Sequence, residues 1–203
     1  VSWVRDRIIQ LRARAEYSPR LHFDVYGTIG EAFGGDINAV ADYLVRLGAA
    51  GQPFAVTVEH VVDAGSRDAQ VRAFAALRAS LRDRGCDVRI AVDEWCNTLE
   101  DIEVFVRAQA ADVIHVKTPD LGGINNTIDA LLLVARHGLL AYCGGSCNET
   151  DRSAQVSAHI AMACGATQVL AKPGMGVDEG MMIVGNEMAR VAALVAGRGR
   201  APA

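Results

Sequence analysis

The chain has 203 residues, of which 51% are hydrophobic and 22% charged, and its formal net charge is -4. This length allows one domain with a sizeable core. The acidic balance argues against non-specific binding to nucleic acid or to an anionic membrane surface. The longest apolar stretch is interrupted by Arg136, His137 and Gly138, so no transmembrane helix is predicted.

Residues 1–20 are predicted to form a helix that precedes the first strand. From there, short apolar runs rich in β-branched residues alternate with amphipathic stretches, which is typical of buried parallel strands connected by helices. Six strands are predicted, at 21–25, 54–59, 88–93, 113–117, 139–143 and 168–171.

Amphipathic stretches fill the intervals between these strands. Asp36 is a candidate N-cap, and Thr98 with Asp101 resembles a capping box. The helix over 68–84 is expected to bury Val71, Phe74, Ala75 and Leu81 and to end at Gly85. The remaining helices are predicted near 36–48, 98–110, 126–137, 151–164 and 180–196.

Six βα units without a β-hairpin signal fit either an open doubly wound sheet or a (β/α)-barrel of the TIM type. No strand is followed by a G-x-G-x-x-G or Walker sequence, which weakens a nucleotide-binding interpretation. Six units are too few to close an eight-stranded barrel, so we expect two strands from outside this chain.

Three carboxylates, Asp24, Glu59 and Asp93, stand at the carboxyl ends of predicted strands, 35 and 34 residues apart. In a parallel barrel they would lie side by side at the mouth. Because like charges repel, such a group favours a bound cation, and oxygen ligands favour Mg²⁺ or Mn²⁺. The alternative is that each carboxylate only caps the helix that follows it.

Lys117 ends the fourth predicted strand. A lysine there can form a salt bridge with a neighbouring carboxylate. It can also act as a general base, because burial and a nearby divalent cation would lower its pKa. A metal-bound carboxylate beside a lysine base is suited to removing a proton α to that carboxylate.

Six motifs extend this pattern in constant order and spacing. They resemble the 3-methylaspartate ammonia-lyase family, a branch of the enolase superfamily. The motifs are LHFDVYGTIG from Leu21, VDAG from Val62, DEWCNT from Asp93, KTPDLGGI from Lys117, GGSCNET from Gly144 and KPGMG from Lys172. The resemblance implies that residues 21–203 are a barrel segment, and that the capping domain and first barrel strands lie outside this chain.

The resemblance also implies roles for single residues. Asp24, Glu59 and Asp93 match magnesium ligands, and Lys117 matches the base that removes the C3 proton of (2S,3S)-3-methylaspartate. The implied reaction is the loss of ammonia to give mesaconate. Substrate contacts are implied for His115, Ser146, Cys147 and Leu170.

This chain departs from the family pattern at three places. His115 replaces a substrate-binding glutamine, Ser146 replaces a threonine, and His60-Val61 follows Glu59 where the family has Gly-Pro. A different pocket leaves open another enolase-superfamily dehydratase or epimerase, and a non-catalytic metal-binding fragment is the third alternative.

The expected partners are a small amino-acid substrate and either a second copy, in a homodimer, or the missing barrel portion. The five cysteines are odd in number and lack zinc-type spacing, so free thiols in a cytoplasmic protein are expected.

Overall fold

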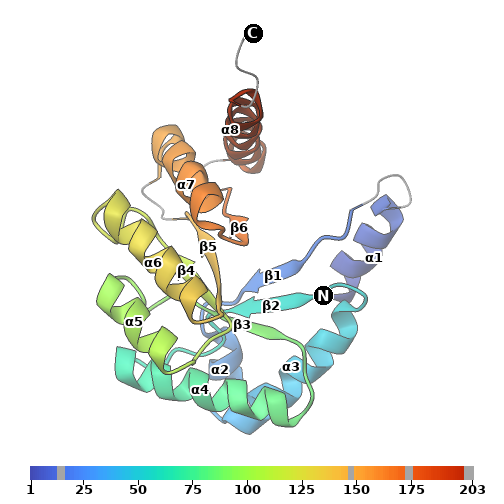
Figure 1. The fold of residues 1–203 in the computed structure, drawn as a ribbon. Helices are drawn as coiled ribbons and strands as arrows, with labels where there is room; N and C mark the ends of the chain where they lie inside the picture. The colour runs from blue at the N-terminus through green and yellow to red at the C-terminus, as the bar shows by residue number, and fades with distance from the viewer. Residues whose placement is uncertain (13–16, 146–148, 172–175, 199–203) are drawn as a thin grey trace. The chain divides into compact units, whose positions relative to one another are not determined.

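The computed structural model describes residues 1–12, 17–145, 149–171 and 176–198 (Figure 1). They form two compact units, the first made of residues 1–96 and 104–113 and the second of residues 97–103 and 114–203. Each unit is described by itself. Within the described residues, no helix combines the length and the apolar character needed to cross a membrane.

The first unit contains a parallel sheet in which sequential strands are neighbours, in the order β1-β2-β3. All four residues of β2 are buried, which suits a central strand. Helices α3 and α4 pack side by side next to this sheet (Figure 1). The elements are α1 (Ser2–Arg12), β1 (Leu21–Asp24), α2 (Thr28–Ala32), α3 (Ile37–Gly51), β2 (Val56–Glu59), α4 (Arg67–Asp83) and β3 (Arg89–Val92).

Two helices of this unit begin at residues whose side chains cap the first helical turn. The Asp36 side chain accepts hydrogen bonds from the backbone N–H groups of Asn38 and Ala39, at 2.9 and 3.3 Å, which confirms its predicted role as N-cap. Ser66 caps α4 in the same way by accepting from Ala69. The single-turn helix α2 was not predicted, because five residues are too few to show a helical period.

The predicted inward face of α4 needs a correction. Phe74 and Leu81 are buried as expected, but Val71 and Ala75 are only half-buried. Gln70 and Leu77 take the inward positions instead. The buried face of α4 is therefore rotated toward Gln70, whose side-chain amide hydrogen-bonds to the backbone of the loop after β2.

The second unit continues the alternation of strand and helix, with the strands again neighbouring one another in chain order. Thr150 and Ser153 form a reciprocal capping box that starts α7. Helix α5 (Leu99–Arg107) has residues in both units. The other elements are β4 (Val113–Val116), α6 (Ile124–Arg136), β5 (Leu140–Cys143), α7 (Asp151–Cys164), β6 (Gln168–Val169) and α8 (Val177–Gly197).

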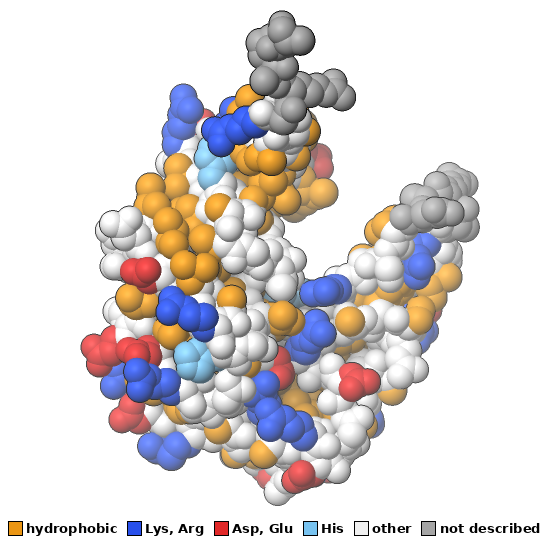
Figure 2. Space-filling view, in the orientation of Figure 1, with side chains coloured by type: hydrophobic (Ala, Val, Ile, Leu, Met, Phe, Trp, Pro, Cys, Tyr) orange, Lys and Arg blue, Asp and Glu red, His pale blue; other side chains and the backbone are white. Residues whose placement is uncertain are grey.

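Helix α8 packs on α7 through Val184, which meets Ala154 and Ala158. Its other faces carry hydrophobic side chains that remain exposed (Figure 2). The exposed large ones on α8 are Val177, Met181, Met182, Met188, Leu194 and Val195. A doubly wound sheet reverses its strand order at a switch point, and neither unit does so. The strand order thus favours a (β/α)-barrel over an open doubly wound sheet.

Candidate functional site

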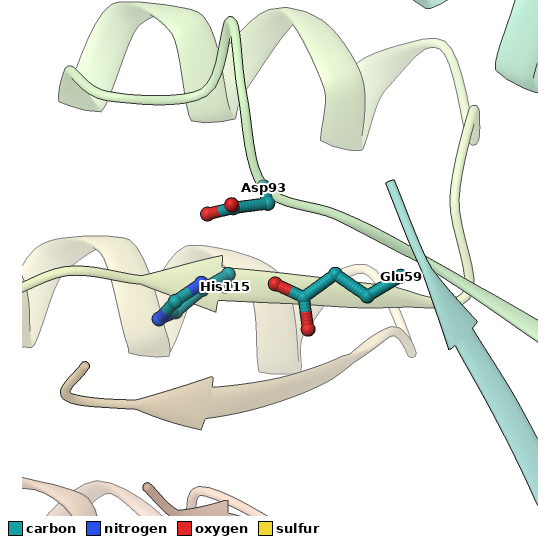
Figure 3. Close-up of side chains that lie close together, drawn as sticks. All are labelled: Glu59, Asp93 and His115. Carbon is teal, nitrogen blue, oxygen red and sulfur yellow. The ribbon is translucent and has the colours of Figure 1, made fainter. Parts of the chain in front are cut away.

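The three predicted carboxylates all belong to the first unit. Asp24 and Glu59 are direct register partners, each at the last residue of its strand, and Asp93 follows the last residue of β3. Carboxylate oxygens of Glu59 and Asp93 lie within 4.8 Å of each other (Figure 3). Parallel strands in register bring these side chains to one end of the sheet, because their carboxyl ends meet there.

Glu59 and Asp93 are 3% and 6% exposed, whereas Asp24 is exposed. Burial, followed by the charge of Glu59 and then that of Asp93, raises the pKa of Asp24, although hydrogen bonds from Tyr26 oppose the shift. The charge of Asp24 is in turn the largest cause of a raised pKa at Tyr26. Because the charges of Glu59 and Asp93 disfavour the ionised form of Asp24, a cation would stabilise the cluster, and its oxygen-only donor set fits Mg²⁺.

His22 contributes to this cluster, although no role was predicted for it. Its Nε2 lies 2.7 Å from Glu59 Oε2, and it comes from β1, two residues before Asp24. Side chains two positions apart in a strand share a face, so the sequence did carry a signal for its position. His22 fixes the orientation of the Glu59 carboxylate.

The loop after β2 is held by contacts on both sides. The backbone N–H groups of Gly27 and Gly30 donate to the carbonyls of His60 and Val61, at 2.6 and 2.9 Å. A Cβ atom at Gly27 would lie 3.1 Å from Asp63 Cβ, and the φ angle of Gly27 is +74°. Glycine therefore lets the two loops approach closely.

Gln70 secures the next part of this loop. Its Nε2 donates to the Val62 carbonyl at 2.7 Å, and its Oε1 accepts from the Ala64 N–H at 2.7 Å. Gln70 is fully buried, so both bonds are shielded from water. Sequence reasoning missed this residue, although a polar side chain on an otherwise apolar helix face was a visible signal.

In the second unit, Lys117 follows the last residue of β4 and is half-buried. Its carbonyl accepts hydrogen bonds from the N–H groups of Asp120 and Leu121, at 3.1 and 3.3 Å. This turn fixes the backbone that carries the predicted base. The lysine thus sits at the carboxyl end of a buried strand, as the sequence indicated.

His115 is 4% exposed and its ring is held on two sides. Its Nε2–H donates to the Gly144 carbonyl at 2.5 Å, and the ring stacks on Tyr142 with centroids 4.1 Å apart. His115 is also labelled in Figure 3. These two contacts fix the position and the orientation of the His115 ring.

Leu170 and Gly145 meet in the same unit. A Cβ atom at Gly145 would lie 2.2 Å from Leu170 Cδ2, so a larger residue would displace this leucine. The Gly145 N–H donates to Glu149 at 3.1 Å, and Glu149 also accepts from Ser157. Sequence reasoning missed Glu149, which orders one flank of the loop. Ser146 and Cys147 lie outside the described residues.

The cysteines that the structure describes are thiols outside any disulfide, as predicted. They are Cys86, Cys96, Cys143 and Cys164. Burial raises the pKa of Cys143 to about 11, so this thiol stays protonated at neutral pH. It is a packing residue rather than a nucleophile.

Comparison with known proteins places this arrangement in context. The family described as methylaspartate ammonia-lyase C-terminus matches residues 1–197. A methylaspartate ammonia-lyase from Clostridium tetanomorphum is 56% identical over 98% of this chain and 48% of its own length. Another from Haloarcula marismortui is 50% identical over 95% of this chain and 46% of its own length. The chain spans about half the length of the curated relatives it matches.

Solved structures of methylaspartate ammonia-lyases are similar to this chain in fold as well as in sequence. A magnesium complex of β-methylaspartase from Clostridium tetanomorphum has a TM-score of 0.93 at 56% identity, covering 97% of this chain and 48% of that one. The Citrobacter amalonaticus methylaspartate ammonia-lyase containing (2S,3S)-3-methylaspartic acid has a TM-score of 0.92 at 45% identity, covering 96% and 47%. A dipeptide epimerase from Cytophaga hutchinsonii, at 20% identity and a TM-score of 0.60, shares the fold alone. The expected fold, a portion of a (β/α)-barrel, is confirmed.

Proposed function

Because this chain belongs to the methylaspartate ammonia-lyase C-terminus family, we propose that it is the metal-binding and base-carrying part of a carbon–nitrogen lyase. The substrate is 3-methylaspartate or a related β-substituted aspartate, and the products are mesaconate (or its analogue) and ammonia. One observation carries the proposal. It is the position of Asp24, Glu59 and Asp93 at the carboxyl ends of three neighbouring strands, with the pKa of Asp24 raised by burial and by the charges of the other two.

Asp24, Glu59 and Asp93 are the residues we assign to Mg²⁺, and the same oxygens suit Mn²⁺. A magnesium complex has been solved for the relative from Clostridium tetanomorphum, which supports this choice. When bound, the ion would supply positive charge to a substrate carboxylate and so make the neighbouring C–H group more acidic. His22 assists by orienting Glu59.

Lys117 is assigned as the base. It takes the C3 proton, the electron pair of that C–H bond forms the C2–C3 double bond, and the C2–N bond breaks so that the ammonium group leaves as ammonia. To accept a proton, Lys117 must first be neutral, which a cation and partial burial both favour. Its position directly after β4 supports the assignment, because catalytic residues of barrels stand at strand carboxyl ends.

The substrate-binding assignments rest on four residues. We propose that His115 contacts the substrate, that Ser146 and Cys147 contact a carboxylate, and that Leu170 forms an apolar wall. The approach of Leu170 to Gly145 supports the last assignment. Because the His115 ring is fixed by Gly144 and Tyr142, it offers a rigid contact, unlike a longer and more flexible glutamine.

Two assays on the protein expressed from its complete coding sequence test this function. Ammonia release and the ultraviolet absorbance of the mesaconate double bond should rise together, at equal molar rates, when (2S,3S)-3-methylaspartate and Mg²⁺ are present. Chelation of the metal should abolish both signals, and added Mg²⁺ should restore them. Absence of ammonia release under all these conditions would contradict the proposal. Turnover of a hydroxy acid instead would indicate a dehydratase.

We further propose that the active assembly is cytoplasmic and supplies the remaining barrel strands, from the same polypeptide or from an associated one, and that it forms a homodimer. Within the described residues β1 has β2 as its only strand neighbour, and unpaired edges are normally covered. The exposed hydrophobic residues of α8 also favour a partner surface. A native mass equal to one 203-residue chain would contradict this assembly.

A further inference from the structure

His60 has no part in the proposed lyase chemistry, yet its side chain is unusually placed. It is 5% exposed, and neither ring nitrogen has a hydrogen-bond partner among the described residues. Burying a polar ring without partners costs free energy, so such groups normally signal a missing ligand or water. Its φ of +49° is also in the left-handed region, which a histidine seldom adopts.

Two carboxylates of the same unit stand next to this ring. One nitrogen of His60 and single oxygens of Asp93 and Glu94 all lie within 4.8 Å of one another. Ligands on opposite sides of an ion with bonds near 2.1 Å are about 4.2 Å apart, so side-chain shifts of only a few tenths of an ångström bring the three atoms onto one cation. His60 and Asp93 are buried and Glu94 is partly exposed, which leaves a route for an ion to enter.

Another nearby carboxylate, Asp63, does not offer His60 a better partner. Its Oδ1 accepts hydrogen bonds from the Gly65 N–H at 2.9 Å and from Trp95 Nε1 at 3.0 Å. The strained backbone at His60 is itself held in place by the Gly27 N–H, which donates to the His60 carbonyl. The fold thus keeps the ring beside Asp93 and Glu94 although nothing described there hydrogen-bonds to it.

We propose that His60, Asp93 and Glu94 form a second divalent-cation site, adjacent to the three-carboxylate cluster and sharing Asp93 with it. One nitrogen and two oxygens suit Zn²⁺, because imidazole binds this ion well whereas Mg²⁺ selects oxygen, and the two carboxylates also admit Mn²⁺. A carboxylate that bridges two metals is a common arrangement. The site does not depend on the lyase activity proposed above.

Zinc titration in the presence of saturating Mg²⁺ tests the site. With isothermal titration calorimetry on the complete protein, we expect one Zn²⁺-binding event that weakens about tenfold or more in both His60→Gly and Glu94→Gln. Glycine tolerates the positive φ, so His60→Gly should fold, and Glu94→Gln changes a partly exposed side chain. His137→Gln, which removes an exposed histidine at the end of α6, serves as control and should bind like the unchanged protein.

A second readout identifies the ligand atom directly. Pulsed electron paramagnetic resonance of bound Mn²⁺ should reveal coupling to a directly bound imidazole nitrogen, and that coupling should disappear in His60→Gly but persist in His137→Gln. Unchanged zinc affinity in His60→Gly, or manganese spectra without nitrogen coupling, would overturn the second site. Both results are independent of ammonia release, so failure of this inference and failure of the proposed function are distinguishable.

Discussion

Asp24 lies directly opposite Glu59 in the parallel register of β1 and β2, so two carboxylates face the same end of the sheet. Burial, followed by the charge of Glu59, raises the pKa of Asp24. Without a cation, the arrangement costs free energy that folding must offset elsewhere. On the proposed function, a bound cation would offset this repulsion, and the effect of the cation on stability can be measured.

Substitution of Asp24 by asparagine should have opposite effects with and without metal. Because the pKa of Asp24 is raised in the folded state, this residue contributes stability at pH values below the ordinary pKa of 3.8. That contribution is lost as the pH rises through the raised pKa. At pH 7 without metal, Asp24→Asn should therefore raise Tm by about 1–3 °C, a small effect because solvent screens this exposed carboxylate. With excess Mg²⁺, the unchanged protein should be the more stable one.

Calorimetric melting with and without Mg²⁺ measures both effects. Asp36→Asn is a suitable control, because asparagine retains the capping ability of this exposed aspartate. It should leave the response to Mg²⁺ intact. If Asp24→Asn kept the full stabilisation by Mg²⁺, Asp24 would not be a metal ligand.

Replacement of Lys117 by arginine separates charge from basicity. Arginine retains the positive charge but does not lose its proton near neutral pH, so it cannot act as the base. We expect Lys117→Arg to lower kcat by about 10²–10⁴-fold, with Mg²⁺ binding in calorimetry changed little. Steady-state ammonia release gives kcat and KM. Retention of near-normal kcat would show that another group removes the C3 proton.

Much of the fold follows from local sequence patterns. The Asp36 cap and the Thr98–Asp101 capping box form as predicted, since each depends on residues within one helical turn. Strand ends are displaced by one or two residues, as at β2, which starts at Val56 rather than Phe54. Whether a residue pairs in a sheet depends on its neighbouring strand, and a single sequence does not contain that information.

In the candidate site, too, local features could be predicted from the sequence and tertiary contacts could not. The alignment of Asp24 with Glu59 follows from one βα repeat, so its chemistry could be predicted from spacing. The sequence signals the positions of His22 and Gln70 but not their partners. His22 pairs with Glu59 across two strands, and Gln70 bonds to the loop that precedes its own helix, and both contacts are set by tertiary packing. The roles of Lys117 and His115 in substrate chemistry stay predictions. Contacts that depend on tertiary packing are the ones that sequence patterns miss.

Gln70 should be essential for the loop after Glu59. Gln70→Ala leaves the Val62 carbonyl and the Ala64 N–H without their hydrogen-bond partner. Each buried polar group left unpaired costs about 1–3 kcal/mol. We expect a destabilisation of about 2–4 kcal/mol in urea unfolding and weaker Mg²⁺ binding. Gln10→Ala, at an exposed glutamine of α1, should change stability by less than about 0.5 kcal/mol. Equal effects of the two variants would exclude a special role for Gln70.

Glu187 ties α8 to α7 and makes that contact sensitive to acid. It accepts hydrogen bonds from Arg190 Nε at 2.9 Å and Arg190 Nη2 at 2.6 Å, and it contacts His159 of α7. Hydrogen bonds from Arg190, then from His159, lower its pKa from 4.5 to about 2. A lowered folded-state pKa contributes stability that is complete above 4.5 and is lost as pH falls toward 2.

Glu187→Gln should therefore lower Tm at pH 7, and the difference from the unchanged protein should narrow as pH falls from 4.5 to 2. Asp129→Asn removes an exposed carboxylate in the middle of α6 and is the matched control, with a Tm difference expected to be small throughout. Thermal melts across this pH range, followed by circular dichroism, test the expectation. A Tm difference independent of pH would mean that Glu187 acts through packing rather than charge. The narrowing, in contrast, would identify the His159–Glu187–Arg190 contact as the acid-labile attachment of α8, the helix that carries the exposed hydrophobic residues.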